Sequence, residues 1–237
     1  MTTDSPTIVL VHGAFADGSG FTEIARRLIA DGYPVVAAAN PLRGLTSDAA
    51  QLKALLASID GPIVLVGHSY GGAVISTAAT GDERVKALVY LAAFVPEVGE
   101  SAQSLVEKFP GSTVDESLKP VPLGDGQVDL YIDPRVFHPN FAADLPARDA
   151  AMYAVTQRPA AGAALGEPAS APQAWHTIRS YNLISGSDKI IPAAAQEFMA
   201  ERSGATAQVV VGASHMVFVS HPDETVALIE TAARESM

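Results

Sequence analysis

A serine flanked by glycines lies directly after a short apolar run in the first third of the chain. Residues 63–66 are typical of a buried parallel strand, and residues 73–79 are typical of a helix. Between them stands Gly67-His68-Ser69-Tyr70-Gly71, which matches G-x-S-x-G, a sharp strand-to-helix turn that holds a serine hydroxyl clear of a sheet. Glycines suit this turn because the strand and helix backbones approach closely there. The pattern predicts that Ser69 acts as a nucleophile.

The same stretch has a second interpretation, a glycine-rich loop or phosphate site at the N-terminus of a helix. A phosphate loop of the form G-x-x-x-x-G-K-[ST] needs a lysine, and residues 67–76 contain none. The nucleophile interpretation therefore depends on a base and an acid elsewhere in the chain.

Two later residues could activate the serine. His215 is the candidate general base, because a serine hydroxyl is a poor nucleophile until its proton is taken. Asp188 would hold the required tautomer of the imidazole and stabilise the imidazolium. An Asx turn is the alternative role for Asp188, and a plain loop position before a helix is the alternative for His215. The other carboxylates considered for the acid are Asp17, Asp82 and Glu97.

Alternating strands and helices must position these residues. The expected strands are residues 7–11, 33–39, 63–66, 85–92, 178–186 and 206–211. The expected helices include residues 17–30, one that begins near Ser47 as N-cap, residues 192–203, and one that begins near Ser220 and Asp223 with capping-box spacing. This rhythm predicts an α/β fold with a doubly wound, mostly parallel six-stranded sheet. Ser69, Asp188 and His215 follow the third, fifth and sixth strands, at the edge where such sheets bind ligands.

The rhythm breaks between residues 96 and 172, which hold ten of the sixteen prolines. Two short helices are expected there, near residues 101–109 and 146–157, with loop for most of the remainder. So long an irregular stretch predicts a lid, inserted after the fourth strand of a core formed by residues 1–95 and 173–237. A disordered linker is the alternative, disfavoured by large apolar residues that favour burial. They are Leu105, Phe109, Tyr131, Phe137, Phe141 and Tyr153.

An oxyanion formed on attack would need hydrogen-bond donors that already point toward it. The backbone N–H groups of Ala14 and Tyr70 are the candidates, and Gly13 would let the first loop come close to a substrate. Apolar side chains could line the substrate pocket, with ordinary packing as the alternative for those in the lid. The candidates are Phe15, Tyr70, Phe94, Tyr131, Phe137 and Met216.

The other five histidines receive structural roles. His12 and His68 flank the site and are expected to shape its loops, His221 precedes a helix, and His138 and His176 are expected at the surface. No spaced set of histidines and carboxylates predicts a metal site. Cysteine is absent, which excludes a disulfide framework and a cysteine nucleophile.

Bulk composition limits the classes of partner. With 237 residues and 48% hydrophobic composition, the chain can bury one large core. Its formal net charge of −11 argues against nucleic acid and anionic membranes as partners. Residues 1–6 carry no export signal and no apolar run is long enough to span a bilayer, which predicts a cytoplasmic protein. Both a monomer and a homodimer stay open.

The sequence resembles the α/β-hydrolase superfamily, most closely the small esterases related to plant methyl esterases and hydroxynitrile lyases. The stretches that carry the resemblance are Val11-His12-Gly13-Ala14, Gly67-His68-Ser69-Tyr70-Gly71-Gly72, Leu91-Ala92-Ala93-Phe94-Val95-Pro96, Asp188 and Ser214-His215-Met216. They lie within residues 7–96 and 178–234. The resemblance implies cofactor-free ester hydrolysis, with the triad on Ser69, Asp188 and His215 and the oxyanion donors on Ala14 and Tyr70.

Two positions separate the branches of this superfamily. The lyases resemble this pattern but carry a threonine where Gly13 stands and a lysine where Met216 stands. The expectation is therefore a serine hydrolase that cleaves small, fairly apolar carboxylic esters through an acyl-enzyme on Ser69. Lyase-like or other cofactor-free chemistry, and a ligand-binding receptor that has lost turnover, are the alternatives.

Overall fold

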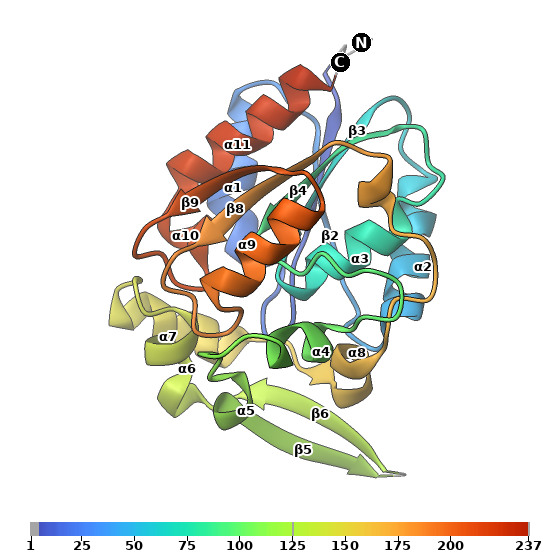
Figure 1. Ribbon diagram of the computed structural model, residues 1–237. Helices are drawn as coiled ribbons and strands as arrows, with labels where there is room; N and C mark the ends of the chain where they lie inside the picture. Colours follow the sequence, from blue (N-terminus) through green and yellow to red (C-terminus); the bar gives the residue numbers. More distant parts are fainter. Residues whose placement is uncertain (1–4, 125, 237) are drawn as a thin grey trace.

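A six-stranded parallel sheet forms the centre of the molecule. The computed structural model describes residues 5–124 and 126–236. The strands of the sheet are β1 (Thr7–Val11), β2 (Val35–Ala38), β3 (Ile63–His68), β4 (Val85–Leu91), β8 (Ser180–Ser185) and β9 (Thr206–Val210). They lie in the order β2-β1-β3-β4-β8-β9, and every neighbouring pair is parallel (Figure 1). The predicted doubly wound sheet is confirmed.

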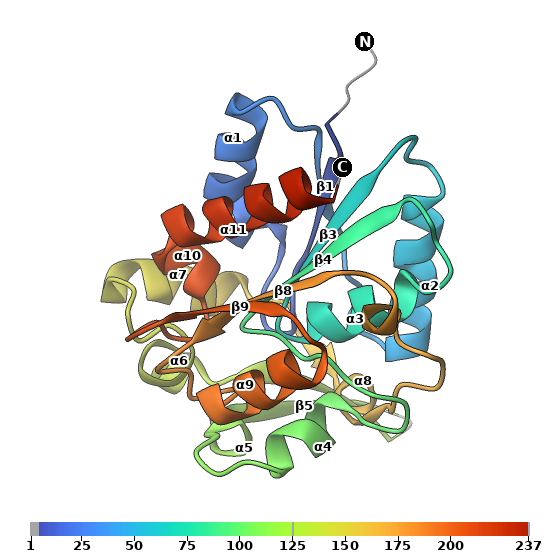
Figure 2. The same ribbon diagram turned by 45° about the horizontal axis from the view of Figure 1, so that its top comes forward.

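Helices cover both faces of this sheet (Figures 1 and 2). On one face lie α1 (Thr22–Ala30) and α11 (Pro222–Glu235); on the other lie α2 (Leu45–Leu56), α3 (Tyr70–Ala78) and α9 (Ala193–Arg202). Short helices η1 (Gly18–Phe21), η2 (Ala174–His176) and α10 (Val217–Ser220) complete the core. Strand β3 is buried over its whole length, and this two-sided cover explains its continuous apolar run.

The predicted start of α2 is wrong by a few residues. The helix begins at Leu45 with Gly44 as its N-cap, and Ser47 lies in the first turn. The hydroxyl of Ser47 donates to the carbonyl of Gly44 (3.0 Å), so it cannot act as the expected cap. The carboxylate of Glu167 instead accepts the backbone N–H of Thr46 in the first turn (3.1 Å).

The predicted capping box before α11 is also wrong. Helix α11 begins at Pro222 after His221, and no side chain within the described ranges caps its first turn. Ser220 ends α10 and its hydroxyl contacts Nδ1 of His221 (2.9 Å), which takes it away from the N-terminus of α11.

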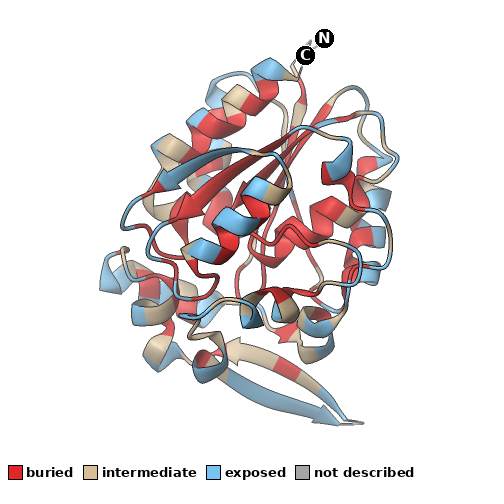
Figure 3. Ribbon diagram, in the orientation of Figure 1, coloured by how far each residue is buried: buried red, intermediate tan, exposed pale blue. Residues whose placement is uncertain are grey.

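The segment between β4 and β8 is more regular than its prolines indicated. The two expected helices are present as α4 (Ala102–Glu107) and α7 (Ala147–Thr156). The expectation of loop for the remainder is wrong, because the segment also contains α5 (Val114–Ser117), α6 (Pro134–Phe141), α8 (Gly162–Gly166) and an antiparallel sheet of β5 (Leu118–Gly124), β6 (Gln127–Ile132) and β7 (Ala160–Ala161). Pro120 and Pro122 argued against a strand at β5. However, β5 is an exposed edge strand, where a missing N–H donor is tolerated (Figure 3).

This segment, here called the insert (residues 96–172), lies at the carboxyl ends of the core strands, opposite the start of β1 (Figure 1). Its side chains Leu105, Phe137 and Phe141 are fully buried and belong to the same apolar cluster as the central strands. The insert is therefore packed onto the core as an ordered layer. No helix in the described part of the chain is long and apolar enough to cross a membrane.

Candidate active site

Ser69 alone makes the turn between β3 and α3. It is only 4% exposed and has φ 52° and ψ −125°, a conformation that is uncommon for any residue with a side chain. Such strain costs on the order of 1–3 kcal/mol and persists only where the surrounding structure holds it in place. The turn therefore has the strained geometry expected for a nucleophile at the end of a strand.

The glycines of the turn are required by space. A Cβ added at Gly71 would lie 2.4 Å from the carbonyl oxygen of Val11, and one at Gly67 would lie 2.7 Å from the carbonyl of Gly71. Both separations are far below van der Waals contact. Strand β3 and helix α3 thus approach each other closely, as the sequence pattern indicated, and β1 also passes close to α3.

His215 and Asp188 form a buried pair at the same edge of the sheet. Nδ1 of His215 lies 2.7 Å from Oδ2 of Asp188, and both side chains are inaccessible to solvent. The other carboxylate oxygen accepts the backbone N–H groups of Ile190 (2.7 Å) and Ile191 (3.0 Å). The bond to Ile190 is an Asx turn. The two roles considered for Asp188 are therefore compatible, since each uses a different oxygen.

The pair leaves the second nitrogen of His215 free. When Asp188 accepts the Nδ1 proton of the neutral ring, Nε2 is left as the acceptor, and no hydrogen-bond partner for it is found among the described residues. The ring of Phe141 packs edge-on against the imidazole at 4.8 Å. A buried, unpaired acceptor on an oriented imidazole is suited to take a proton.

His68 links the serine turn to the histidine loop. Its Nε2–H donates to the carbonyl of His215 (3.0 Å), and the two rings lie 4.8 Å apart. Burial, together with the neighbouring His215, holds the pKa of His68 well below its usual value, so the ring is a neutral donor. The residue before Ser69 is therefore joined directly to His215.

His12 organises the first loop in a similar way. Its Nδ1–H donates to the carbonyl of Gly13 (3.0 Å), and its Nε2 accepts the backbone N–H of Asn40 (3.1 Å). Burial lowers the pKa of His12, which keeps it neutral. A Cβ added at Gly13 would lie 2.6 Å from Cβ of Ser69, so this loop passes directly beside the serine.

The two candidate oxyanion donors line the same cavity as Ser69. Ala14 follows Gly13 in the first loop, and Tyr70 begins α3. Within residues 5–124 and 126–236, the hydrogen bonds of the structure include none donated by either backbone N–H. Both N–H groups therefore have no acceptor in the described part of the chain.

The cavity has a volume of about 150 Å³ and a mainly apolar wall. Its lining residues are Ala14, Phe15, Ser69, Tyr70, Phe94, Ala102, Gln103, Val106, Glu107, Val114, Asp115, Leu118, Leu130, Gly162, Leu165 and Ile190. The insert supplies most of them, from Ala102 to Leu165. Among the described residues, the charged members of this wall are Glu107 and Asp115.

Of the predicted pocket residues, Phe15, Tyr70 and Phe94 line this cavity. Phe137 is fully buried against Phe141, Met216 lines a separate small recess, and Tyr131 lies half-buried on β6. A substrate contact by Gly13, Tyr131, Phe137 or Met216 stays a prediction.

The alternative acids have other partners. Asp17 caps η1, Asp82 pairs with Arg84 (2.6 Å), and Glu97 pairs with His176 (2.8 Å). His138, expected at the surface, is half-buried and contacts the carbonyl of Leu145 (3.0 Å). No group of three or more potential metal ligands occurs in the described part of the chain.

Sequence reasoning missed Gln196, on α9. Its amide nitrogen donates to Oδ2 of Asp188 (2.9 Å) and to the carbonyl of Ile191 (2.7 Å), while its oxygen accepts the N–H of Ser185 (3.0 Å). The Asp188 oxygen that faces His215 therefore has a second donor. A buried glutamine eight residues after an aspartate gives no recognisable pattern.

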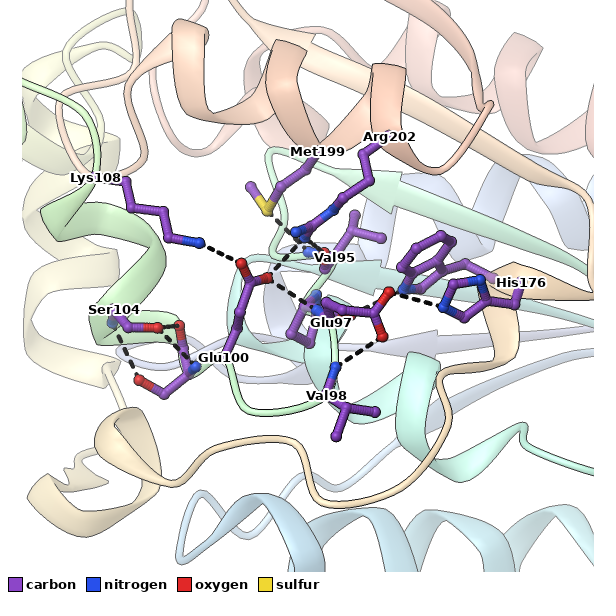
Figure 4. A network of polar contacts seen from close by, with 12 residues as sticks. Val95, Glu97, Val98, Glu100, Ser104, Lys108, His176, Met199 and Arg202 are labelled. Atoms are coloured by element: carbon purple, nitrogen blue, oxygen red, sulfur yellow. Dashed lines mark hydrogen bonds and ion pairs between the residues drawn. The ribbon is translucent and has the colours of Figure 1, made fainter.

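Sequence reasoning also missed a polar network around Glu100, at the start of the insert (Figure 4). Arg202 donates to Glu100 (2.8 Å) and to the carbonyl of Val95 (2.6 Å), and Lys108 forms an ion pair with the same carboxylate. Burial alone would raise the pKa of Glu100, but these hydrogen bonds outweigh it and lower the pKa to about 2. The network holds the loop that carries Phe94 into the cavity.

A parallel sheet in this order, with a strained serine after β3, defines the α/β-hydrolase fold. The Alpha/beta hydrolase family matches residues 8–228, and the chain belongs to this family.

Known proteins similar to this chain include several esterases. A carbendazim hydrolyzing esterase from Nocardioides sp. (strain SG-4G) is 34% identical over 113 residues, which cover 42% of this chain and 47% of the relative, so the match spans about half of its length. The crystal structure of polyneuridine aldehyde esterase superimposes with a TM-score of 0.81 at 20% identity, over 96% of this chain and 99% of that one. The methylesterase MES16 from Arabidopsis gives 0.79 at 19% identity, over 97% and 99%. The resemblance to plant methyl esterases is confirmed at the level of the fold.

Proposed function

We propose that the protein hydrolyses small, fairly apolar carboxylic esters through an acyl-enzyme on Ser69. The observation that carries this proposal is the buried pair of Asp188 and His215, whose free Nε2 belongs to a loop bonded to the residue before Ser69. A strained serine that lines an apolar cavity, with an oriented base bonded to the residue before it, fits what acyl transfer requires.

In the first half-reaction, Nε2 of His215 takes the proton of Ser69 as Oγ bonds to the ester carbonyl carbon. The backbone N–H groups of Ala14 and Tyr70 stabilise the oxyanion, and Asp188 stabilises the imidazolium. The bond to the alcohol oxygen then breaks, and His215 gives that oxygen its proton. In the second half-reaction, water loses a proton to His215, attacks the acyl carbon and releases the acid, while Oγ of Ser69 recovers the proton.

The cavity supports the choice of substrate class. A volume of about 150 Å³ suits a small acyl or alcohol group, and the wall is mainly apolar. Relatives described as a carbendazim hydrolyzing esterase and a methylesterase support an ester-type linkage as the functional group cleaved.

The space beside Ser69 favours ester hydrolysis over cyanohydrin cleavage. A Cβ at Gly13 would lie 2.6 Å from Cβ of Ser69 and 2.8 Å from the carbonyl of His68, so the threonine of the lyases would not fit without a shift of the turn. A receptor without turnover would bind ligands but would form no acyl-enzyme, and a burst of released alcohol separates that alternative from an esterase.

The test combines covalent labelling with substitution. A fluorophosphonate probe should modify Ser69, as located by peptide mass spectrometry, and Ser69→Ala should lower kcat for p-nitrophenyl acetate roughly 10⁴- to 10⁶-fold. Ser58→Ala is the control, because Ser58 is exposed and its hydroxyl donates to the carbonyl of Leu55 at the end of α2. Full activity in Ser69→Ala, or a probe adduct on another serine, would refute the proposal.

A further inference from the structure

A four-residue stretch of the insert makes polar contacts with two loops of the core through three of its residues. This brace segment (residues 158–161) connects α7 to α8. The carbonyl of Arg158 accepts the backbone N–H of Phe15 (3.1 Å). The N–H of Ala161 donates to the carbonyl of Leu42 (2.8 Å), in the loop after β2. The insert is thus bonded to the loops that follow β1 and β2.

The first contact bears on the Ala14 side of the oxyanion hole. Phe15 has φ 60°, an unusual value for an aromatic residue, so its backbone needs support to persist. The bond from Phe15 N–H to Arg158 fixes the peptide plane that joins Ala14 to Phe15. The brace segment therefore limits the rotation of the backbone that presents the N–H of Ala14.

The Tyr70 side of the oxyanion hole depends on the phenol of Tyr70. Its backbone N–H is the other oxyanion donor, and its hydroxyl donates to Oδ2 of Asp48 (3.0 Å). Asp48 is only 1% exposed and also accepts the backbone N–H of Arg43 at both oxygens (3.1 Å each). Burial and the charge of Asp48 raise the pKa of the Tyr70 phenol, so it remains a donor.

Arg43 connects this buried carboxylate to the insert. While its backbone bonds to Asp48, its guanidinium donates to Asp129 on β6 (2.6 Å) and to the carbonyl of Pro159 in the brace segment (2.9 Å). Asp129 in turn pairs with Ala161 across the β6–β7 ladder. A continuous set of hydrogen bonds therefore runs from the insert through Arg43 and Asp48 to Tyr70.

We propose that the docked insert aligns both halves of the oxyanion hole, and that Tyr70, Asp48 and Arg43 act as positioning residues through the phenol and this hydrogen-bond set. The inference rests on the proposed esterase function. The oxyanion carries its full charge only during reaction. Misalignment of its donors therefore reduces stabilisation of the transition state more than it reduces binding of the ester. The expected signature is a fall in kcat with little change in KM.

Tyr70→Phe tests the phenol contact by removing one oxygen atom. We expect kcat for p-nitrophenyl acetate to fall about tenfold, less than the 10²- to 10³-fold loss of a whole oxyanion donor, with KM within about twofold of the wild type. Tyr181→Phe is the matched control, since the buried Tyr181 also donates to a carboxylate, Glu235 (2.9 Å), but on β8 away from the cavity. Its kcat should stay at the wild-type value.

Arg43→Gln tests the contact with the insert, and Arg135→Gln is its control. Arg135 lies on α6 of the insert and pairs with Asp133 at the surface. We expect kcat to fall about three- to tenfold in Arg43→Gln and to stay unchanged in Arg135→Gln. The double variant Arg43→Gln/Tyr70→Phe should lose about as much as Tyr70→Phe alone, because residues in one network are not additive.

All rates are to be divided by the fraction of molecules that the fluorophosphonate probe labels on Ser69. If Tyr70 only stabilises the fold, the labelled fraction will fall while kcat per labelled site stays constant, and that outcome overturns the inference. Multiplicative losses in the double variant also overturn it. In both cases labelling and turnover of the wild type leave the esterase proposal intact; a wild type that neither labels nor hydrolyses any ester ends both proposals.

Discussion

Replacement of Asp188 by asparagine should impose the wrong tautomer on His215, and the surrounding bonds dictate which way the new amide points. The N–H groups of Ile190 and Ile191 both require an acceptor at the Oδ1 position. The amide oxygen must therefore stay there, and the NH₂ group takes the place of Oδ2. It then faces Nδ1 of His215 and also the donating amide of Gln196.

Two effects follow from this orientation. An NH₂ group facing Nδ1 requires that nitrogen to accept, so the proton moves to Nε2 and His215 can no longer take the proton of Ser69. A wrong tautomer of this kind costs about 10⁴-fold in kcat. In addition, the NH₂ group of the new asparagine and that of Gln196 would face each other, and a buried donor left without an acceptor costs about 1–3 kcal/mol of unfolding free energy.

The assay is steady-state hydrolysis of p-nitrophenyl acetate, with urea unfolding in parallel. Asp82→Asn is the matched control, since Asp82 also accepts a backbone N–H two residues ahead, from Arg84 (3.1 Å), but lies away from the cavity. It should lose stability without loss of kcat. If Asp188→Asn retained kcat within about tenfold of the wild type, the tautomer reasoning and the assignment of His215 as base would both be wrong.

Two further predictions concern charge. Glu107 and Asp115 line the cavity without an ion pair among the described residues. The kcat/KM for an ester that bears a free carboxylate should therefore be about fivefold lower than for its neutral analogue, and Glu107→Gln should reduce this difference. If the ratio of the two kcat/KM values were the same in about 0.02 M and about 1 M salt, the electrostatic cause would be contradicted. For Glu100, the lowered pKa of about 2 means that its stabilising effect is complete above its usual pKa near 4.5 and is lost as the pH falls toward 2. Between about pH 4.5 and pH 2, the unfolding free energy of the wild type should therefore fall by on the order of 1 kcal/mol more than that of Glu100→Gln. The difference is small because solvent screens this partly exposed carboxylate, and urea titration at each pH measures it.

The strands of the parallel sheet and the residues that follow them were predictable because their signals are local. A strand, a glycine-framed turn and a helix lie within residues 63–79, and the steric need for Gly67 follows from the nearby backbone of Gly71 and Gly72 alone. Parallel topology then brings the end of β1 beside the end of β3, with Val11 opposite Gly67. The parallel topology thus brings residues far apart in the chain together, so no sequence pattern that links them is needed to predict that they meet.

The insert was less predictable because its structure depends on contacts between distant residues. Prolines in β5 suppressed the strand pattern, although an edge strand accepts them. The contacts that position the insert, such as Arg43 with Asp129 and Arg202 with Glu100, join residues 86 and 102 positions apart. Neither member of such a pair belongs to a motif, so sequence spacing could not reveal them.

The core and the insert contribute different parts of the site, so specificity could change without loss of the catalytic groups. Ser69, Asp188 and His215 are held by the core, whereas most of the cavity wall comes from the insert. Substitutions in the wall would alter which ester fits while leaving the base and its acid in place. The exception is the brace segment, because it contacts the loop that carries Ala14 and, through Arg43 and Asp48, is linked to Tyr70, the two proposed oxyanion donors. Changes there should lower kcat for every ester alike, whereas changes at wall residues such as Leu165 should alter the ratio of kcat/KM between esters of different size.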